Sequence, residues 1–170
     1  MKKATPPRIG YKATVNCIVT LHVDERENNE DRAGVEHRDF AAFRCKSAAV
    51  IAMRNFWTGE SSKQCDYSYY DVSFTYELGE IVTAKNYNST DKNLVFTGGI
   101  HYYKCEEAAE AEFTLFNEKR LRKQGIPFKM VLAQPQSGRI GVKKWYGAKG
   151  ELKRVEYYNR FNHCCGVDEW

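Results

Sequence analysis

Residues 100–125 read IHYYKCEEAAEAEFTLFNEKRLRKQG, and this stretch decides the fold class. Its first four residues are rich in aromatic side chains, as in a β-strand, whereas the rest has helical periodicity. Acidic residues come early in the helical part, and basic residues followed by Gly125 come late. That order suits the helix dipole and a glycine helix end. The stretch predicts a strand over Ile100–Tyr103 and a helix over Cys105–Phe116, or over a longer range that ends before Gly125.

Strands are predicted on both sides of this helix. Apolar and polar residues alternate over Ala13–Val23, which predicts a strand with one buried face. The tyrosine-rich stretch Tyr67–Tyr76 predicts another strand, and Phe128–Ala133 predicts a short one after the helix. One helix among many strands predicts an α+β fold: a twisted, mainly antiparallel sheet, one main helix and a C-terminal β-hairpin.

The hairpin is predicted from an internal repeat. Gly141 and Gly166 are 25 residues apart, and so are Trp145 and Trp170. Gly150 permits a turn between two strands, and Trp145 is expected to pair across the strands with Tyr157 or Tyr158. We therefore expect an α+β domain over 1–134 and a hairpin tail over 135–170, with a turn at 135–138.

Positive charge is concentrated in the last third of the chain. Residues 1–116 carry 14 Lys/Arg and 17 Asp/Glu, whereas residues 117–170 carry 12 and 5, a net charge of +7. Basic residues interleaved with aromatic ones suit a polyanion surface, although a solvated strand or helix face has the same composition. The residues predicted to contact nucleic acid are Lys119, Arg120, Arg122, Lys123, Lys143, Lys144, Lys153 and Arg154. The residues predicted to contact protein partners are Trp145, Tyr146, Tyr157, Tyr158 and Trp170.

Candidates for chemistry are few. His101 follows two glycines and would act as a general base only with a carboxylate or thiol nearby; the alternative is a buried ring that hydrogen-bonds the backbone. Arg44 and Lys46 fit either a phosphate site or a solvated strand face. The cysteines have neither the pairing nor the spacing of a zinc site, so no cofactor or metal is expected. No apolar run approaches the length of a membrane span.

Two stretches resemble known viral sequences. Residues 44–113 resemble a domain of unknown function of large DNA viruses that infect amoebae, often found beside pentapeptide repeats. The matching segments are Arg44–Ser47, Phe74–Glu80 and Gly99–Tyr103. Residues 141–170 resemble a degenerate MORN-type repeat of the same viruses. Its matching residues are Gly141, Trp145, Tyr146, Gly150 and Leu152. The resemblance implies a Marseillevirus-like source and places the viral domain at about 44–116.

These observations lead to three hypotheses. The first is a non-enzymatic, virion-associated protein that binds viral DNA non-specifically, or another virion protein, through its basic last third. Such a protein would be found in the virion, the host cytoplasm or the viral factory, and its aromatic tail would favour a homodimer. The second is a module that binds host proteins with the MORN-like tail. The third is an enzyme centred on His101.

Overall fold

The computed structural model describes residues 7–35, 37–64, 66–71, 73–95, 97–134, 139–158 and 164–169, with only the backbone at some strand positions after Lys129. These residues form two compact units. The first comprises Met1–Arg32 and Phe43–Tyr102, and the second comprises Ala33–Ala42 and Tyr103–Trp170. The expected boundary between residues 134 and 135 stays a prediction.

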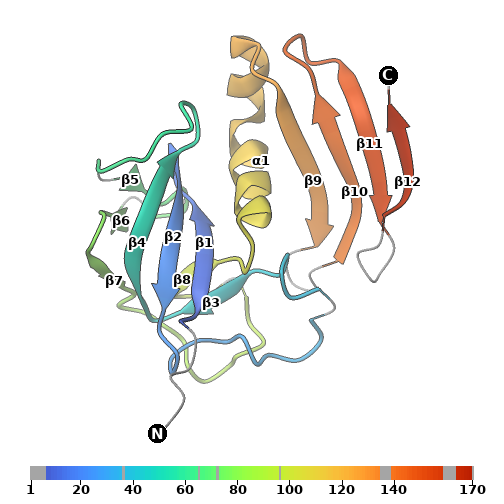
Figure 1. Cartoon of the computed structure of the whole chain (residues 1–170). Coiled ribbons are helices and arrows are strands. Elements are labelled where there is room, and N and C mark those ends of the chain that lie inside the picture. Colours follow the sequence, from blue (N-terminus) through green and yellow to red (C-terminus); the bar gives the residue numbers. More distant parts are fainter. Residues whose placement is uncertain are drawn as a thin grey trace, which may run out of the picture. The chain divides into compact units, whose positions relative to one another are not determined.

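The first unit contains eight strands among its described residues. They are β1 (Ile9–Ala13), β2 (Cys17–Val23), β3 (Phe43–Cys45), β4 (Ser47–Asn55), β5 (Asp66–Tyr67), β6 (Thr75–Tyr76), β7 (Ile81–Thr83) and β8 (Ile100–Tyr102). An antiparallel sheet runs in the order β1-β2-β4-β7, and β3-β8 and β5-β6 form two-stranded sheets (Figure 1). β7 therefore lies at one edge of the larger sheet.

Burial of apolar side chains explains why these segments become strands. In β2, Val19, Leu21 and Val23 are buried, as their alternation predicts, and Ile18 is buried as well. Beside them, the ring of Phe43 in β3 lies 6.1 Å from that of Tyr102 in β8. Side chains of this size each contribute about 1.5–3 kcal/mol on burial, so these strands form the core of the first unit.

The tyrosine-rich stretch does not form the single strand predicted for Tyr67–Tyr76. Among the described residues of this stretch only β5 and β6 are strands, with two residues each, and they pair antiparallel with Tyr67 opposite Thr75. The chain turns back between them, with the Ser68 N–H donating to the Phe74 carbonyl at 3.0 Å. Aromatic content indicated β structure but carried no information about this reversal.

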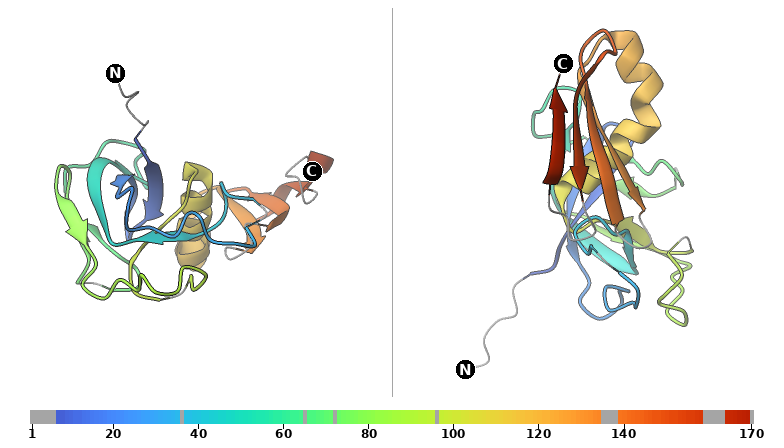
Figure 2. Two further views of the ribbon diagram at one scale, coloured as in Figure 1. Left: turned by 90° about the horizontal axis from the view of Figure 1, so that it is seen from below. Right: turned by 90° about the vertical axis from the view of Figure 1, so that its right-hand side faces the viewer.

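The second unit contains one helix and four strands among its described residues. They are α1 (Glu106–Gln124), β9 (Phe128–Gln134), β10 (Arg139–Tyr146), β11 (Leu152–Tyr158) and β12 (Cys164–Glu169). The strands form an antiparallel sheet in the order β12-β11-β10-β9. α1 lies alongside β9, and β12 is the strand farthest from the helix (Figures 1 and 2). The predicted α+β class, the single helix and the C-terminal hairpin are thus confirmed.

The ends of α1 follow the sequence signals. Glu106 and Glu107 lie in its first turn, and Gly125 follows it in the left-handed conformation at φ 64°, which glycine adopts without strain. Ala109 and Phe113 are buried, whereas Phe116 is half-exposed. The helix is therefore the longer of the two alternatives that the sequence left open.

The hairpin differs in register from the prediction. Trp145 lies opposite Arg154, and Tyr157 lies opposite Val142, so the expected Trp145–Tyr157 or Trp145–Tyr158 pair is wrong. A bulge next to Tyr146 shifts the register, which composition does not reveal. The turn expected at 135–138, Trp170 and the side chains of Tyr157 and Tyr158 lie outside the described residues.

Candidate functional site

The basic cluster of α1 occupies its last two turns, where Arg122 has a structural role. Its guanidinium pairs with Glu118 at 3.0 Å and lies 4.7 Å from the centre of the Tyr146 ring and 5.1 Å from that of Phe128. It also donates to the Gly150 carbonyl at 3.1 Å. Arg122 therefore fastens the end of α1 to β9, β10 and the turn between β10 and β11.

Three of the four basic residues predicted on the strands are paired with carboxylates. Lys143 is only 8 % exposed, and its ammonium lies 2.9 Å from Glu107. Lys153 pairs with Glu151 at 3.4 Å. Arg154 pairs with two carboxylates, those of Glu156 and Glu169. Paired cations attract a polyanion less, so the eight predicted residues do not form one uncompensated positive surface.

A smaller group keeps its charge exposed at one end of the second unit. Lys119 and Lys123 on α1 and Lys149 in the β10–β11 turn are exposed, and no ion pair engages them within the described part of the chain. Successive helical residues turn by about 100°, which places Lys119 and Lys123 roughly 40° apart on one face. Arg122 holds this turn against the helix through Gly150. We call Lys119, Lys123 and Lys149 the basic end.

Four other predicted contact residues lie on α1 and β10. Arg120 is exposed on α1, and Lys144 is partly exposed on β10. Tyr146 stacks on Phe128 with 5.0 Å between ring centres. Trp145 lies under two cations, with Lys129 at 5.5 Å and Arg154 at 5.4 Å from its ring. The described aromatic side chains are thus engaged in the packing of the sheet.

His101 lies in the first unit and is held by the backbone. Its Nε2 donates to the Val95 carbonyl at 2.7 Å, which confirms the expected backbone hydrogen bond. Burial, reinforced by the nearby Lys12 ammonium, lowers the pKa of His101 from 6.5 to about 4. Lys12 itself is buried and donates to the His101 carbonyl at 3.2 Å. The ring is therefore neutral at neutral pH, and the residue is only partly exposed.

Arg44 is neither a phosphate ligand nor a solvated strand residue, contrary to both expectations. It is fully buried in β3. Its guanidinium donates to four backbone carbonyls in the loop before β8, and it lies 5.1 Å from the Tyr87 ring centre. The four acceptors belong to Asn88, Asp91, Leu94 and Gly98. Alternation alone could not reveal this, because the acceptors are main-chain atoms about 50 residues further on.

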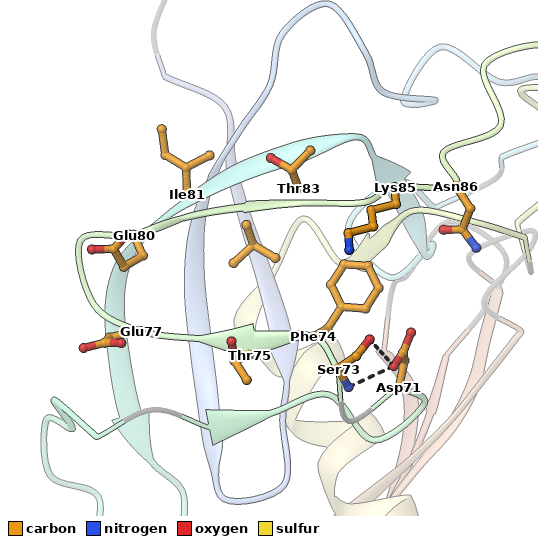
Figure 3. A pocket seen from close by; sticks show the side chains of 11 residues that line it. Asp71, Ser73, Phe74, Thr75, Glu77, Glu80, Ile81, Thr83, Lys85 and Asn86 are labelled. Carbon is orange, nitrogen blue, oxygen red and sulfur yellow. Dashed lines mark hydrogen bonds between the residues drawn. The ribbon is translucent and has the colours of Figure 1, made fainter.

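A groove lies between β6 and β7 in the first unit, with a volume of about 680 Å³. One wall is formed by Asp71, Ser73, Phe74, Thr75 and Glu77, and the other by Glu80, Ile81, Val82, Thr83, Lys85 and Asn86. Figure 3 shows the side chains of Phe74 and Lys85 pointing toward one another between the two strands. The sequence does not predict this groove, because the groove depends on the chain reversal between β5 and β6. We call it the β6–β7 groove.

Metal and membrane signals are both lacking in the described part of the chain. No three His, Cys, Asp or Glu side chains gather there in a way that could hold a metal ion. Its helix is also too polar to cross a bilayer.

Comparison with known proteins places the chain in a family. A family of unknown function, DUF5758, matches residues 2–109, which is more than half of the chain. The chain belongs to DUF5758. The DUF5758 match spans the first unit and ends in the first turn of α1, so the sheet β9–β12 lies outside it. No curated protein and no solved structure matches the chain.

Proposed function

We propose that this DUF5758 member is a non-enzymatic binding protein whose basic end binds DNA without sequence preference. The observation that carries the proposal is the exposure of Lys119, Lys123 and Lys149 without ion pairs in the described structure. A duplex carries a closely spaced row of phosphates, and each ammonium that contacts one releases condensed counterions. Three neighbouring ammonium groups on a helix end and a turn suit contact with the phosphate backbone.

The arrangement favours phosphate contact over reading of base edges. Arg122, whose guanidinium would suit guanine, is engaged by Glu118, Tyr146 and Gly150. The three lysines carry compact charges on flexible stems, which recognise phosphates without directional specificity. A structural role for Lys123 is the competing explanation, because a cation in the last turn of a helix stabilises its dipole. The two roles separate by measurement, since only the first requires added DNA, whereas a contribution to the helix dipole changes the stability of the protein alone.

The setting that we propose for this activity is a virus particle. Support comes from the resemblance of residues 44–113 to a domain of large DNA viruses of amoebae, and of residues 141–170 to a MORN-type repeat. A Marseillevirus-like source would make viral DNA the polyanion and the virion or viral factory the place of action. Another virion protein with an acidic surface is the alternative partner for the same lysines.

A salt-titrated gel shift with a 30-base-pair duplex tests the proposal. We expect wild-type protein to shift two unrelated duplexes equally. Its affinity for both should fall steeply as the salt concentration rises. The variant Lys119→Ala/Lys123→Ala/Lys149→Ala should bind at least tenfold more weakly and lower the logarithmic salt slope by roughly 2–3. The matched control is Lys46→Ala/Lys63→Ala/Lys92→Ala, which removes the same charge from the first unit. Equal weakening by both triple variants, or no wild-type shift at low salt, would overturn the proposal.

A further inference from the structure

β7 is an edge strand with unused backbone hydrogen-bonding groups. Every second residue from Glu80 to Ala84 pairs through its backbone with β4 or with Lys46 just before it. The Glu80 carbonyl accepts from the Val50 N–H, Val82 pairs with Ala48, and the Ala84 N–H donates to the Lys46 carbonyl. In an antiparallel ladder, the residues that alternate with these three direct their N–H and C=O groups away from the neighbouring strand. Ile81 and Thr83 therefore direct theirs away from β4, and both residues line the β6–β7 groove.

β6 faces the same groove from the other side. The Phe74 carbonyl accepts from Ser68, and Tyr76 lies opposite Asp66 of β5, so the backbone groups of Thr75 point away from β5. No ladder joins β6 to β7 among the described strands. Both walls of the groove therefore offer main-chain donors and acceptors, the arrangement that receives an added strand.

The side chains around the groove define the chemistry of an occupant. Ile81 is 70 % exposed, so its side chain offers apolar surface that an occupant can cover. Three carboxylates line the groove, those of Asp71, Glu77 and Glu80, against the single ammonium of Lys85. A second copy of β7 would bring its own Glu80 against this surface, and like charges repel. An occupant with positive charge fits better.

We propose that the β6–β7 groove binds an extended, positively charged segment of a partner protein as an additional strand on β7. The segment forms ladder hydrogen bonds with Ile81 and Thr83, covers the Ile81 side chain with an apolar residue, and places Lys or Arg near Glu77 and Glu80. This site lies in the first unit and does not depend on the DNA-binding role of the basic end.

Selection from a random twelve-residue peptide library displayed on phage tests the proposal on the full-length chain. Thr83→Pro removes the N–H that faces the groove while the ladder with β4 keeps its bonds, and Thr83→Val is the matched control that retains the N–H. We expect wild type and Thr83→Val to enrich peptides in which Lys or Arg alternates with apolar residues. The synthetic form of an enriched peptide should bind Thr83→Pro about tenfold more weakly.

Two further measurements keep the test decisive if Thr83→Pro folds poorly. Glu77→Lys/Glu80→Lys changes only exposed side chains and should also lose tenfold or more in affinity. Bound peptide should slow amide hydrogen exchange at Ile81 and Thr83, and a peptide N-methylated at alternate residues should not. Failure of wild type to enrich basic peptides, or unchanged exchange at these two amides on binding, would overturn the proposal.

Discussion

Arg44 shows how one buried side chain can order a long loop. Its guanidinium satisfies carbonyls between Asn88 and Gly98, groups that would otherwise require water or a ladder. Because a buried cation is costly unless its hydrogen bonds are complete, the loop and the arginine depend on one another. Lysine cannot replace it, since an ammonium lacks the planar fork that reaches several carbonyls at once.

Replacement of Arg44 by Ala or Lys should therefore destabilise the protein strongly. We expect Arg44→Ala to lower the free energy of unfolding by about 3 kcal/mol, because several buried carbonyls lose their donor. Arg44→Lys should recover only part of this. Urea unfolding measures the effect. The control is Lys46→Ala, between β3 and β4, because its exposed pair with Glu27 contributes little. A loss below about 1 kcal/mol for Arg44→Ala would contradict this role.

His101 should make stability depend on pH. Its folded pKa of about 4 lies below the ordinary 6.5, so the unfolded chain binds the proton more readily between these values. Stability from the neutral ring is complete above pH 6.5 and is lost as the pH falls toward 4, by up to about 3 kcal/mol. In urea unfolding at several pH values, His101→Gln should flatten this dependence. His22→Gln, at an exposed position, should leave it unchanged.

At the scale of elements, Glu107 joins α1 to two strands. Its carboxylate accepts from Lys129 of β9 at 2.5 Å and pairs with Lys143 of β10 at 2.9 Å. Burial alone would raise the pKa of Glu107, but these two ammonium groups outweigh it and hold the pKa below its ordinary value. The first turn of the helix is thereby fixed to the sheet by charge as well as by packing.

Glu107→Ala should accordingly cost about 2–3 kcal/mol of unfolding free energy, because it removes the carboxylate facing a nearly buried ammonium. Thermal or urea unfolding followed by circular dichroism would measure it. Glu118→Ala breaks the exposed pair with Arg122 on the same helix and should cost well under 1 kcal/mol. Similar costs for the two variants would show that Glu107 has no special role.

The elements differ in how far sequence alone predicts them. α1 was predictable because its acidic start, basic end and Gly125 are local signals, and β2 because its apolar residues alternate. The division of Tyr67–Tyr76 into β5 and β6 was not, since it depends on a chain reversal stabilised by Ser68 and Phe74. The candidate sites were harder to predict from the sequence. The ion pairs of Lys143 and Arg154 and the free edge of β7 depend on how the strands pair, which local sequence signals do not show.

At the scale of the whole molecule, the two proposed sites belong to different units and should work independently. The triple lysine variant of the basic end should keep wild-type affinity for a groove peptide, and Thr83→Pro should keep wild-type affinity for DNA. Fluorescence anisotropy with labelled peptide and labelled duplex measures both on the same preparations. Loss of both activities in either variant would instead indicate a general defect in folding.

The segment Ala33–Ala42 belongs to the second unit although the residues on both sides of it belong to the first. Its Phe40 is buried, with the Lys143 ammonium 5.5 Å from the ring centre. A ribosome adds residues at about 5–20 per second, so Phe40 is added roughly 5–20 s before Lys143. During synthesis the nascent chain thus carries this ring before its later neighbour exists, so the second unit is completed only after the whole first unit has been made.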